Sequence, residues 1–126
     1  MAYQVLITEP VNEKGLDFLR EQGYTLITGT GPDEETLLRE CRDCDGALTR
    51  NGKFTQRVFE GCPKLKVVSM HGVGVDGIDV EAATNLGIQI CNAAESNQKS
   101  VAEYAVGLIL MLAKHSVVYN NGLKSG

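Results

Sequence analysis

The residues from His71 to Asp79 read HGVGVDGID and contain a G-x-G-x-x-G spacing that begins at Gly72. This is the spacing of loops that bind the pyrophosphate of dinucleotides, where glycines let the backbone approach the phosphates. An acidic residue, Glu95, follows at about the distance of the acid that binds the ribose. The segment therefore offers two chemistries, a dinucleotide site or a cradle of backbone N–H groups for a smaller anion.

We predict the anion cradle. In a dinucleotide site the helix begins at the second or third glycine, whereas here the next helical pattern begins at Val80 and is short. The loop also follows the fourth predicted strand, not the first. Glycine-rich backbone at the carboxyl end of a parallel strand suits a small carboxylate. A tight turn without a ligand is the alternative interpretation.

Short apolar runs alternate with helical patterns through most of the chain. Runs rich in β-branched residues predict strands at 3–8, 24–28, 46–49, 65–70 and 88–91. Helical spacing predicts helices between them at 12–22, 33–41, 55–60 and 80–86. Such alternation produces a parallel sheet covered on both faces. The sequence therefore predicts an α/β fold, a flavodoxin-like three-layer sandwich with strand order 2-1-3-4-5.

The pattern from Ser96 to Val118 predicts a long C-terminal helix, followed by a polar, turn-like tail. Ser96 and Ser100 are alternative caps of this helix, and Ser100 and Glu103 have the spacing of a capping box. Residues 101–113 are apolar nearly all round, so we expect them to be buried nearly all round. A sheet covers only one side of such a helix. We therefore predict a homodimer or larger assembly, with residues 101–113 in the interface or swapped between chains.

Composition indicates an ordinary globular domain, with 43% apolar and 22% charged residues. The net charge is −4 and no basic patch stands out, so we expect no nucleic-acid partner. The longest apolar run contains Glu103 and is too short to span a bilayer, so we expect no membrane partner. No secretory signal precedes the first strand, and we expect a cytoplasmic protein.

The cysteines at positions 41, 44, 62 and 91 predict no metal site. Cys41 and Cys44 form a C-x-x-C pair, but this pair lies at the end of a predicted helix and lacks a second ligand pair. The other two have no His or Cys neighbour at metal-ligand spacing. We expect all four to be ordinary reduced cysteines.

Two stretches are informative in combination. They are LKVVSMHGVGVDGIDVEAATNLGIQICNA at residues 65–93 and SNQKSVAEYAVGLILMLAKHS at residues 96–116. Together they resemble the N-terminal, substrate-binding region of the D-isomer-specific 2-hydroxyacid dehydrogenase family. VLITEPVNEKGLDFL, at residues 5–19, is similar to it more loosely. The resemblance thus covers nearly the whole chain, and its combination of G-V-G-V-D-x-I-D with S-V-A-E-Y is specific.

The resemblance implies how a small 2-hydroxy or 2-keto acid binds. In the family, backbone N–H groups of the loop Gly72–Gly74 hold the substrate carboxylate, which implicates Val73 and Gly74. A basic residue after the third strand helps to bind the anionic groups of the substrate, and Arg50 in ALTRNGKFT has that position. A solvated loop arginine is the alternative interpretation of Arg50.

Supporting roles are also implied. Asn97 and Glu103 match the family pattern at the start of the linking helix, where we expect them to brace the hinge and the glycine loop. We expect Asp76 and Asp79 to cap the short helix after the loop, because acids favour helix N-termini.

Two departures from the family pattern weaken the expectation of standard substrate binding. Gly77 stands where the family usually has Asn. Since both residues tolerate a left-handed backbone, we expect the turn to survive without the side-chain hydrogen bond. Met70 stands where the family often has a basic residue.

The resemblance implies that hydride transfer belongs to residues outside this sequence. In the family an NAD-binding Rossmann domain carries the catalytic Arg, Glu and His. We therefore expect no catalytic residue, no metal and no bound cofactor in this chain alone, and NAD in the parent enzyme. We expect His71 to be a rim or core residue and His115 to interact with the dipole of the long helix.

Residues 1–95 are assigned to the substrate-binding domain, and residues 96–126 to a linking helix and tail that lead toward the Rossmann domain. Two further functions stay open. The chain is alternatively a stand-alone module that binds small acids, or an oligomerisation module. A separate NAD-binding domain is a possible partner.

Overall fold

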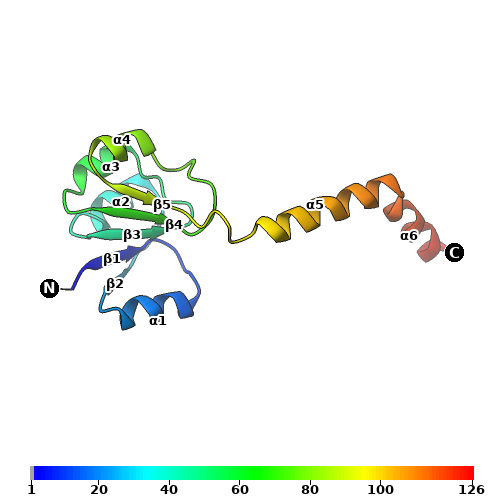
Figure 1. Ribbon diagram of the computed structural model, residues 1–126, viewed down its shortest axis with the longest axis horizontal. Helices are drawn as coiled ribbons and strands as arrows, with labels where there is room; N and C mark the ends of the chain where they lie inside the picture. Colours follow the sequence, from blue (N-terminus) through cyan, green and yellow to red (C-terminus); the bar gives the residue numbers. More distant parts are fainter. Residues whose placement is uncertain (1) are drawn as a thin grey trace. The chain divides into compact units, whose positions relative to one another are not determined.

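The computed structural model describes residues 2–126 in two compact units, of which the first ends at Ala93 and the second begins at Ala94. The second unit contains two helices, α5 (Gln98–Ala113) and α6 (Ser116–Ser125). The first unit alternates strands and helices (Figure 1), in the order β1 (Gln4–Ile7), α1 (Glu13–Glu21), β2 (Thr25–Thr28), α2 (Glu34–Glu40), β3 (Gly46–Thr49), α3 (Gln56–Gly61), β4 (Val67–Met70), α4 (Val80–Asn85) and β5 (Gln89–Cys91).

The strands of the first unit form one parallel sheet in the order β2-β1-β3-β4-β5. Helix α1 lies on one face of this sheet, and α2, α3 and α4 lie on the other (Figure 1). The predicted α/β sandwich and its strand order are therefore confirmed. The strands and the first four helices lie within two residues of their predicted bounds, because glycines and polar caps separate the apolar runs.

One row of side chains across the sheet shows how strand register builds the core. Leu6 pairs with Ile27 on one side and with Ala47 on the other, and Ala47 pairs in turn with Val68. Residues in register point to the same face of a parallel sheet. Leu6 and Val68 are fully buried in the main apolar cluster, together with side chains of α2, α3 and α4. Burial of each such side chain stabilises the fold by about 1.5–3 kcal/mol.

Side-chain caps determine where the helices of the first unit begin. Each cap accepts a hydrogen bond from a backbone N–H in the first turn of its helix and contributes about 1 kcal/mol. The capping residues of α1, α2, α3 and α4 are Asn12, Asp33, Thr55 and Asp79. The polar residues that precede the helices thus set the lengths of the loops that leave the sheet.

The second unit differs from its prediction in two respects. The predicted single helix over residues 96–118 is interrupted at Lys114 and His115, where His115 adopts a left-handed backbone with φ of 53°. The tail predicted to be turn-like continues as α6 to Ser125. His115 therefore separates two helices and directly follows the C-cap of α5, and its expected interaction with the helix dipole stays a prediction. Histidine is among the side chains enriched in left-handed backbone, which favours this break.

None of the residues of α5 is buried by the described part of the chain. Leu112, for example, is 77% exposed, although the helix is apolar nearly all round. The expected burial of α5 is therefore not found among residues 2–126. Among residues 2–126 no single helix is long and apolar enough to span a membrane. Helices α5 and α6 have the required length and apolarity only when taken together, and they are bent by 62° relative to each other.

Candidate functional site

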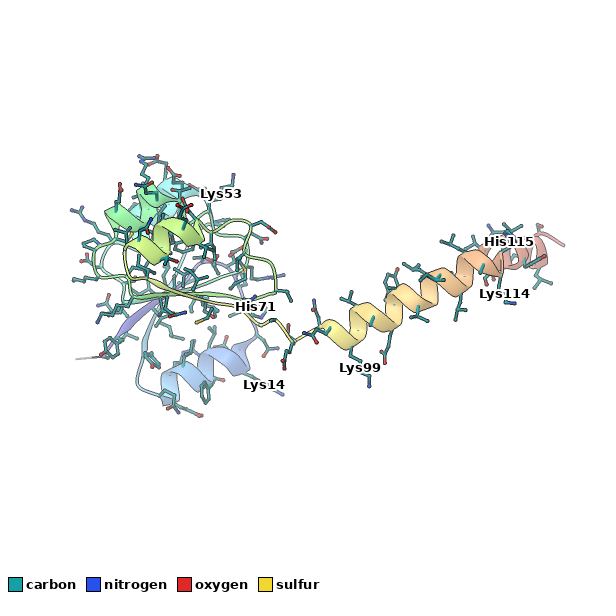
Figure 2. The ribbon with its side chains drawn as sticks, turned by 45° about the horizontal axis from the view of Figure 1, so that its top comes forward. Lys14, Lys53, His71, Lys99, Lys114 and His115 are labelled. Carbon is teal, nitrogen blue, oxygen red and sulfur yellow. The ribbon has the colours of Figure 1, made fainter. Side chains whose placement is uncertain are left out.

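Two loops meet at the carboxyl edge of the sheet. The first follows β3 and covers residues 50–54, and the second, the glycine loop, follows β4 and covers residues 71–79. Because β3 and β4 pair directly, the loops leave the sheet next to each other. Lys53 of the first loop and His71 of the second are labelled in Figure 2. Ligands of open α/β sheets bind at this edge, so the two loops form the candidate site.

Phe54 joins the two loops. Its N–H donates to the carbonyl of Gly77 at 2.9 Å, and its carbonyl accepts from the N–H of Asp79 at 2.8 Å. Together these bonds form a parallel bridge between Phe54 and Ile78. The Phe54 ring is fully buried and stacks against Phe59, with 6.0 Å between the ring centroids. The bridge is therefore anchored in the core.

Gly77 is a point of close backbone approach. A Cβ atom at this position would lie 2.8 Å from the carbonyl oxygen of Gly52, which is closer than real Cβ atoms come. Its φ lies outside the left-handed region, which among residues 2–126 is occupied by Gly23, Gly87, His115 and Gly126. The turn is present, as expected, but its backbone is not left-handed, so tolerance of that conformation is not the reason. Glycine is required here because no side chain fits between the two loops.

Val73 and Gly74, the predicted carboxylate-binding residues, lie in the exposed part of the glycine loop. Within residues 2–126 neither of their backbone N–H groups has a hydrogen-bond acceptor. Successive unpaired N–H groups of this kind attract anions. The loop thus has the donors that the predicted cradle requires.

Two hydrogen bonds from the segment after β5 orient these donors. The Asn92 side-chain amide donates to the carbonyl of Val73 at 2.8 Å, and the N–H of Ala93 donates to the carbonyl of Gly72 at 2.8 Å. A trans peptide points its carbonyl and its N–H in opposite directions. Because these two carbonyls point toward Asn92 and Ala93, the N–H groups of Val73 and Gly74 point away from that segment. The sequence analysis did not predict Asn92 as a site residue. Its position directly after the fifth strand, at the same sheet edge as the glycine loop, was the signal that could have indicated it.

Arg50 begins the first loop, and its side chain is exposed. Its backbone N–H donates to the carboxylate of Glu9 at 2.8 Å. Within the described residues its guanidinium group forms no ion pair and no hydrogen bond. The structure thus brings Arg50 to the same sheet edge as the glycine loop and leaves its positive charge unpaired.

Glu9, a second residue absent from the predicted site, follows β1 and reaches across to the first loop. One carboxylate oxygen accepts from the N–H groups of Arg50 and Asn51 at 2.8 and 3.1 Å, and the other accepts from the Asn51 side chain at 2.8 Å. The Thr8 hydroxyl donates to the same carboxylate at 2.7 Å. Partial burial raises the pKa of Glu9, but these hydrogen bonds outweigh burial and lower its pKa from 4.5 to about 2.

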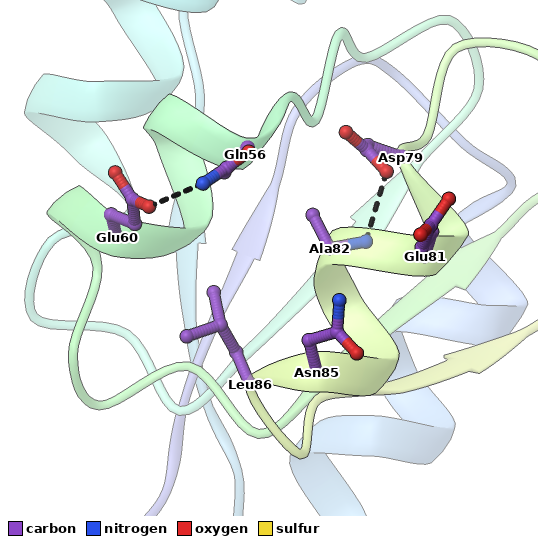
Figure 3. A pocket seen from close by; sticks show the side chains of 7 residues that line it. All are labelled: Gln56, Glu60, Asp79, Glu81, Ala82, Asn85 and Leu86. Atoms are coloured by element: carbon purple, nitrogen blue, oxygen red, sulfur yellow. Dashed lines mark hydrogen bonds between the residues drawn. The ribbon is translucent and has the colours of Figure 1, made fainter.

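The two aspartates after the glycines have different environments. Asp79 accepts from the N–H of Ala82 at 2.9 Å and caps α4, as predicted (Figure 3). Asp76 does not cap this helix; its carboxylate instead lies 3.2 Å from the place that a Cβ on Gly74 would occupy. The expected capping role of Asp76 is therefore wrong, because two residues, Gly77 and Ile78, separate it from the cap position.

An acidic cavity of about 340 Å³ lies between α3 and α4 and is shown in Figure 3. Three of its lining side chains are carboxylates, Glu60, Asp79 and Glu81. Glu60 accepts from the Gln56 amide at 2.7 Å, and Asp79 is engaged in its cap. Among residues 2–126 no three side chains are arranged to hold a metal ion. A cavity lined by carboxylates repels a carboxylate ligand, so the candidate site remains the two loops.

Three of the four cysteines are buried in the core of the first unit. The hydrogen bond with Cys62, followed by burial, raises the pKa of Cys41, and burial raises the pKa of Cys44. The Cys44 thiol donates to the carbonyl of Glu40 at 3.3 Å. The Cys41 and Cys44 thiols therefore stay protonated near neutral pH and behave as small core residues, whereas the hydrogen bond with Cys41 lowers the pKa of Cys62.

Asn97 and Glu103 both belong to the second unit. Asn97 precedes α5 without a capping hydrogen bond from its side chain. Glu103 forms an exposed ion pair with Lys99, 3.8 Å away, one turn earlier on the helix. Ser100 lies inside the helix and not at its start, so the predicted capping box is wrong. The role of Asn97 and Glu103 as a brace for the hinge and the glycine loop stays a prediction.

Comparison with known proteins gives consistent matches. The chain is 41% identical over 124 residues to a D-3-phosphoglycerate dehydrogenase from Methanocaldococcus jannaschii, covering 98% of this chain and 24% of that protein. It therefore spans about a quarter of this curated relative. The crystal structure of the PH0520 protein from Pyrococcus horikoshii OT3 matches all of this chain and 38% of its own, with a TM-score of 0.89 and 28% identity.

A second solved structure carries a cofactor. An NAD-dependent formate dehydrogenase from Staphylococcus aureus, in complex with NAD, matches with a TM-score of 0.72 and 28% identity, over 87% of this chain and 38% of that one. The sequence model of the D-isomer specific 2-hydroxyacid dehydrogenase catalytic domain matches residues 5–121. This chain therefore belongs to the D-isomer specific 2-hydroxyacid dehydrogenase family.

Proposed function

We propose that this chain is the substrate-binding part of an NAD-dependent D-2-hydroxyacid dehydrogenase, similar to D-3-phosphoglycerate dehydrogenase, and that the Val73 and Gly74 N–H groups bind the carboxylate of a small 2-hydroxy or 2-keto acid. The observation that carries the proposal is the pair of unpaired N–H groups, each oriented by a hydrogen bond to the carbonyl of its own peptide. Donors fixed in this way need little reorganisation when an anion binds.

Arg50 provides the second contact with the ligand. Its guanidinium group is exposed and unpaired within the described residues, and it extends from the loop next to the cradle. Guanidinium groups bind phosphates and carboxylates through two parallel hydrogen bonds. A ligand with a carboxylate at one end and another anionic group at the other, such as 3-phosphoglycerate, suits this pair of contacts.

Hydride transfer requires a nicotinamide cofactor, for which residues 71–79 are a poor fit. A dinucleotide loop ends in the N-terminus of a long helix that faces the pyrophosphate. Here α4 begins only at Val80, after the bridge to Phe54, and has six residues. We therefore assign NAD binding to another part of the parent enzyme, and we expect this chain to be inactive alone. The Val73 and Gly74 contacts bind and orient the substrate.

The second unit supplies the contacts with other polypeptides. Helix α5 exposes large apolar side chains along its length, with Ile109 64% and Leu112 77% exposed. Contiguous exposed apolar faces mark association sites. We propose that residues 101–113 pair with a second copy of this chain, and that a separate NAD-binding domain is a further partner. A stand-alone acid-binding or oligomerisation module is the alternative function, which the same exposed helix favours.

Calorimetric titration with D-3-phosphoglycerate and, separately, with NADH tests the proposal. We expect saturable binding of the acid only, and weaker binding to Arg50→Ala. Arg42→Ala is the matched control, because Arg42 is also exposed and precedes β3 where Arg50 follows it. Equal weakening by both variants would indicate a general charge effect. Stoichiometric NADH binding would instead identify the glycine loop as a cofactor site, and binding of neither compound would favour the oligomerisation module.

A further inference from the structure

The Glu9 carboxylate accepts several hydrogen bonds from the first loop. Both of its oxygens are engaged, and the donors include two successive backbone N–H groups, those of Arg50 and Asn51. Successive N–H groups of this kind form an anion-binding nest. Here the anion that occupies the nest is a side chain of the same chain, from a strand end more than 40 residues away in sequence.

The hydroxyl groups of Thr8 and Thr49 make further hydrogen bonds to Glu9 and to the first loop. The Thr49 hydroxyl lies 3.2 Å from the Glu9 carboxylate and 2.9 Å from the Thr8 hydroxyl, and it accepts from the N–H of Gly52 at 2.8 Å. Thr8 and Thr49 are buried. The backbone of residues 50–52 is therefore held by hydrogen bonds that converge on one carboxylate.

We infer that Glu9 is a positioning residue, which fixes the backbone at Arg50 so that the guanidinium group is presented to the second anionic group of the ligand. The inference rests on the proposed function. Glu9 does not neutralise Arg50, because among residues 2–126 its carboxylate is satisfied by N–H and hydroxyl donors and forms no ion pair with the guanidinium group. The loop is thereby ordered while its positive charge stays available.

The charge state of Glu9 is consistent with this role. Since hydrogen bonds hold its pKa far below 4.5, the carboxylate stays ionised throughout the neutral range. Glutamine at this position would present an N–H₂ group to N–H donors. Glu9→Gln therefore removes acceptors with little change in size.

Amide hydrogen exchange tests whether Glu9 holds the loop. We expect exchange at Arg50 and Asn51 to accelerate about tenfold or more in Glu9→Gln, as the loss of charge-assisted hydrogen bonds predicts. Glu13→Gln is the matched control, since Glu13 is a nearby carboxylate whose described hydrogen bond goes to Arg20 at 2.6 Å. Unchanged exchange at Arg50 and Asn51 in Glu9→Gln would overturn the inference, whatever the affinity for acids.

A double-mutant cycle tests whether Glu9 acts through Arg50. Glu9→Gln should weaken D-3-phosphoglycerate binding about tenfold in the parent chain and have little further effect in the Arg50→Ala background. A merely structural role predicts the same loss in both backgrounds, and that result would overturn the inference. If the parent chain fails to bind the acid while Glu9→Gln still accelerates exchange, the proposed function is refuted and the hold of Glu9 on the loop is supported.

Discussion

Replacement of Gly77 by alanine tests the contact between the two loops most directly. The added Cβ would lie 2.8 Å from the backbone carbonyl oxygen of Gly52. This oxygen cannot rotate away as the end of a side chain would. Relief requires a shift of one loop, and the bridge through Phe54, with bonds of 2.9 and 2.8 Å, opposes that shift.

The cost follows from this geometry. Overpacking a site that cannot relax freely costs about 1–3 kcal/mol, a large share of the stability of a small domain. Gly74→Ala is the matched control in the same loop, because its Cβ would meet only the Asp76 carboxylate, at 3.2 Å. That carboxylate is the end of a flexible, exposed side chain, so we expect the control to cost less than about 0.5 kcal/mol.

Urea unfolding followed by circular dichroism measures both variants against the parent chain. We expect Gly77→Ala to lower the midpoint without changing the m-value, and Gly74→Ala to leave both nearly unchanged. Equal midpoints for the three proteins would refute the reasoning, since the loops would then be free to separate at no cost. Gly77→Asn carries the same Cβ, so restoring the usual family residue should destabilise this chain at least as much.

Four further outcomes are expected. Asn92→Ala should weaken acid binding in calorimetry several-fold, because it releases the Val73 carbonyl. Asp79→Ala should lower the free energy of unfolding by about 1 kcal/mol in urea, through loss of the α4 cap. The Glu9 pKa is lowered to about 2, so its contribution to stability is complete above pH 4.5 and is lost as pH falls toward 2; Glu9→Gln should flatten stability measured over that range. Leu112→Glu should reduce the mass measured by light scattering at micromolar concentration, and a monomeric parent chain would contradict the proposed assembly.

The fold of the first unit could be predicted because its signals are local. Apolar runs such as the one at β4 lie between glycines, prolines and capping residues, so each element can be recognised from its neighbours in sequence. Asp79 is an example, since its capping role depends on the residues that directly follow it. The alternation of strands and helices then predicts a parallel sheet, and 2-1-3-4-5 is one of its common strand orders.

The site could be predicted only in part, because its supporting contacts join distant residues. Arg50, Val73 and Gly74 follow strands, and the resemblance to the family indicates them. Glu9 reaches the loop after β3, and Gly77 meets the backbone of Gly52; neither contact has a local sequence pattern. The break at His115 has a different cause, since a left-handed residue competes there with a continuous apolar helix pattern.

The bridge through Phe54 has a consequence for selectivity. It fixes one loop against the other before any ligand arrives, so the span between the Arg50 backbone and the N–H groups of Val73 and Gly74 is a property of the fold. In the proposed binding mode, the two loops hold the two anion-binding contacts at a fixed separation. A ligand whose anionic groups match that span gains both contacts, and a shorter or longer acid gains only one. In that binding mode, the domain would select its ligands by length as well as by charge.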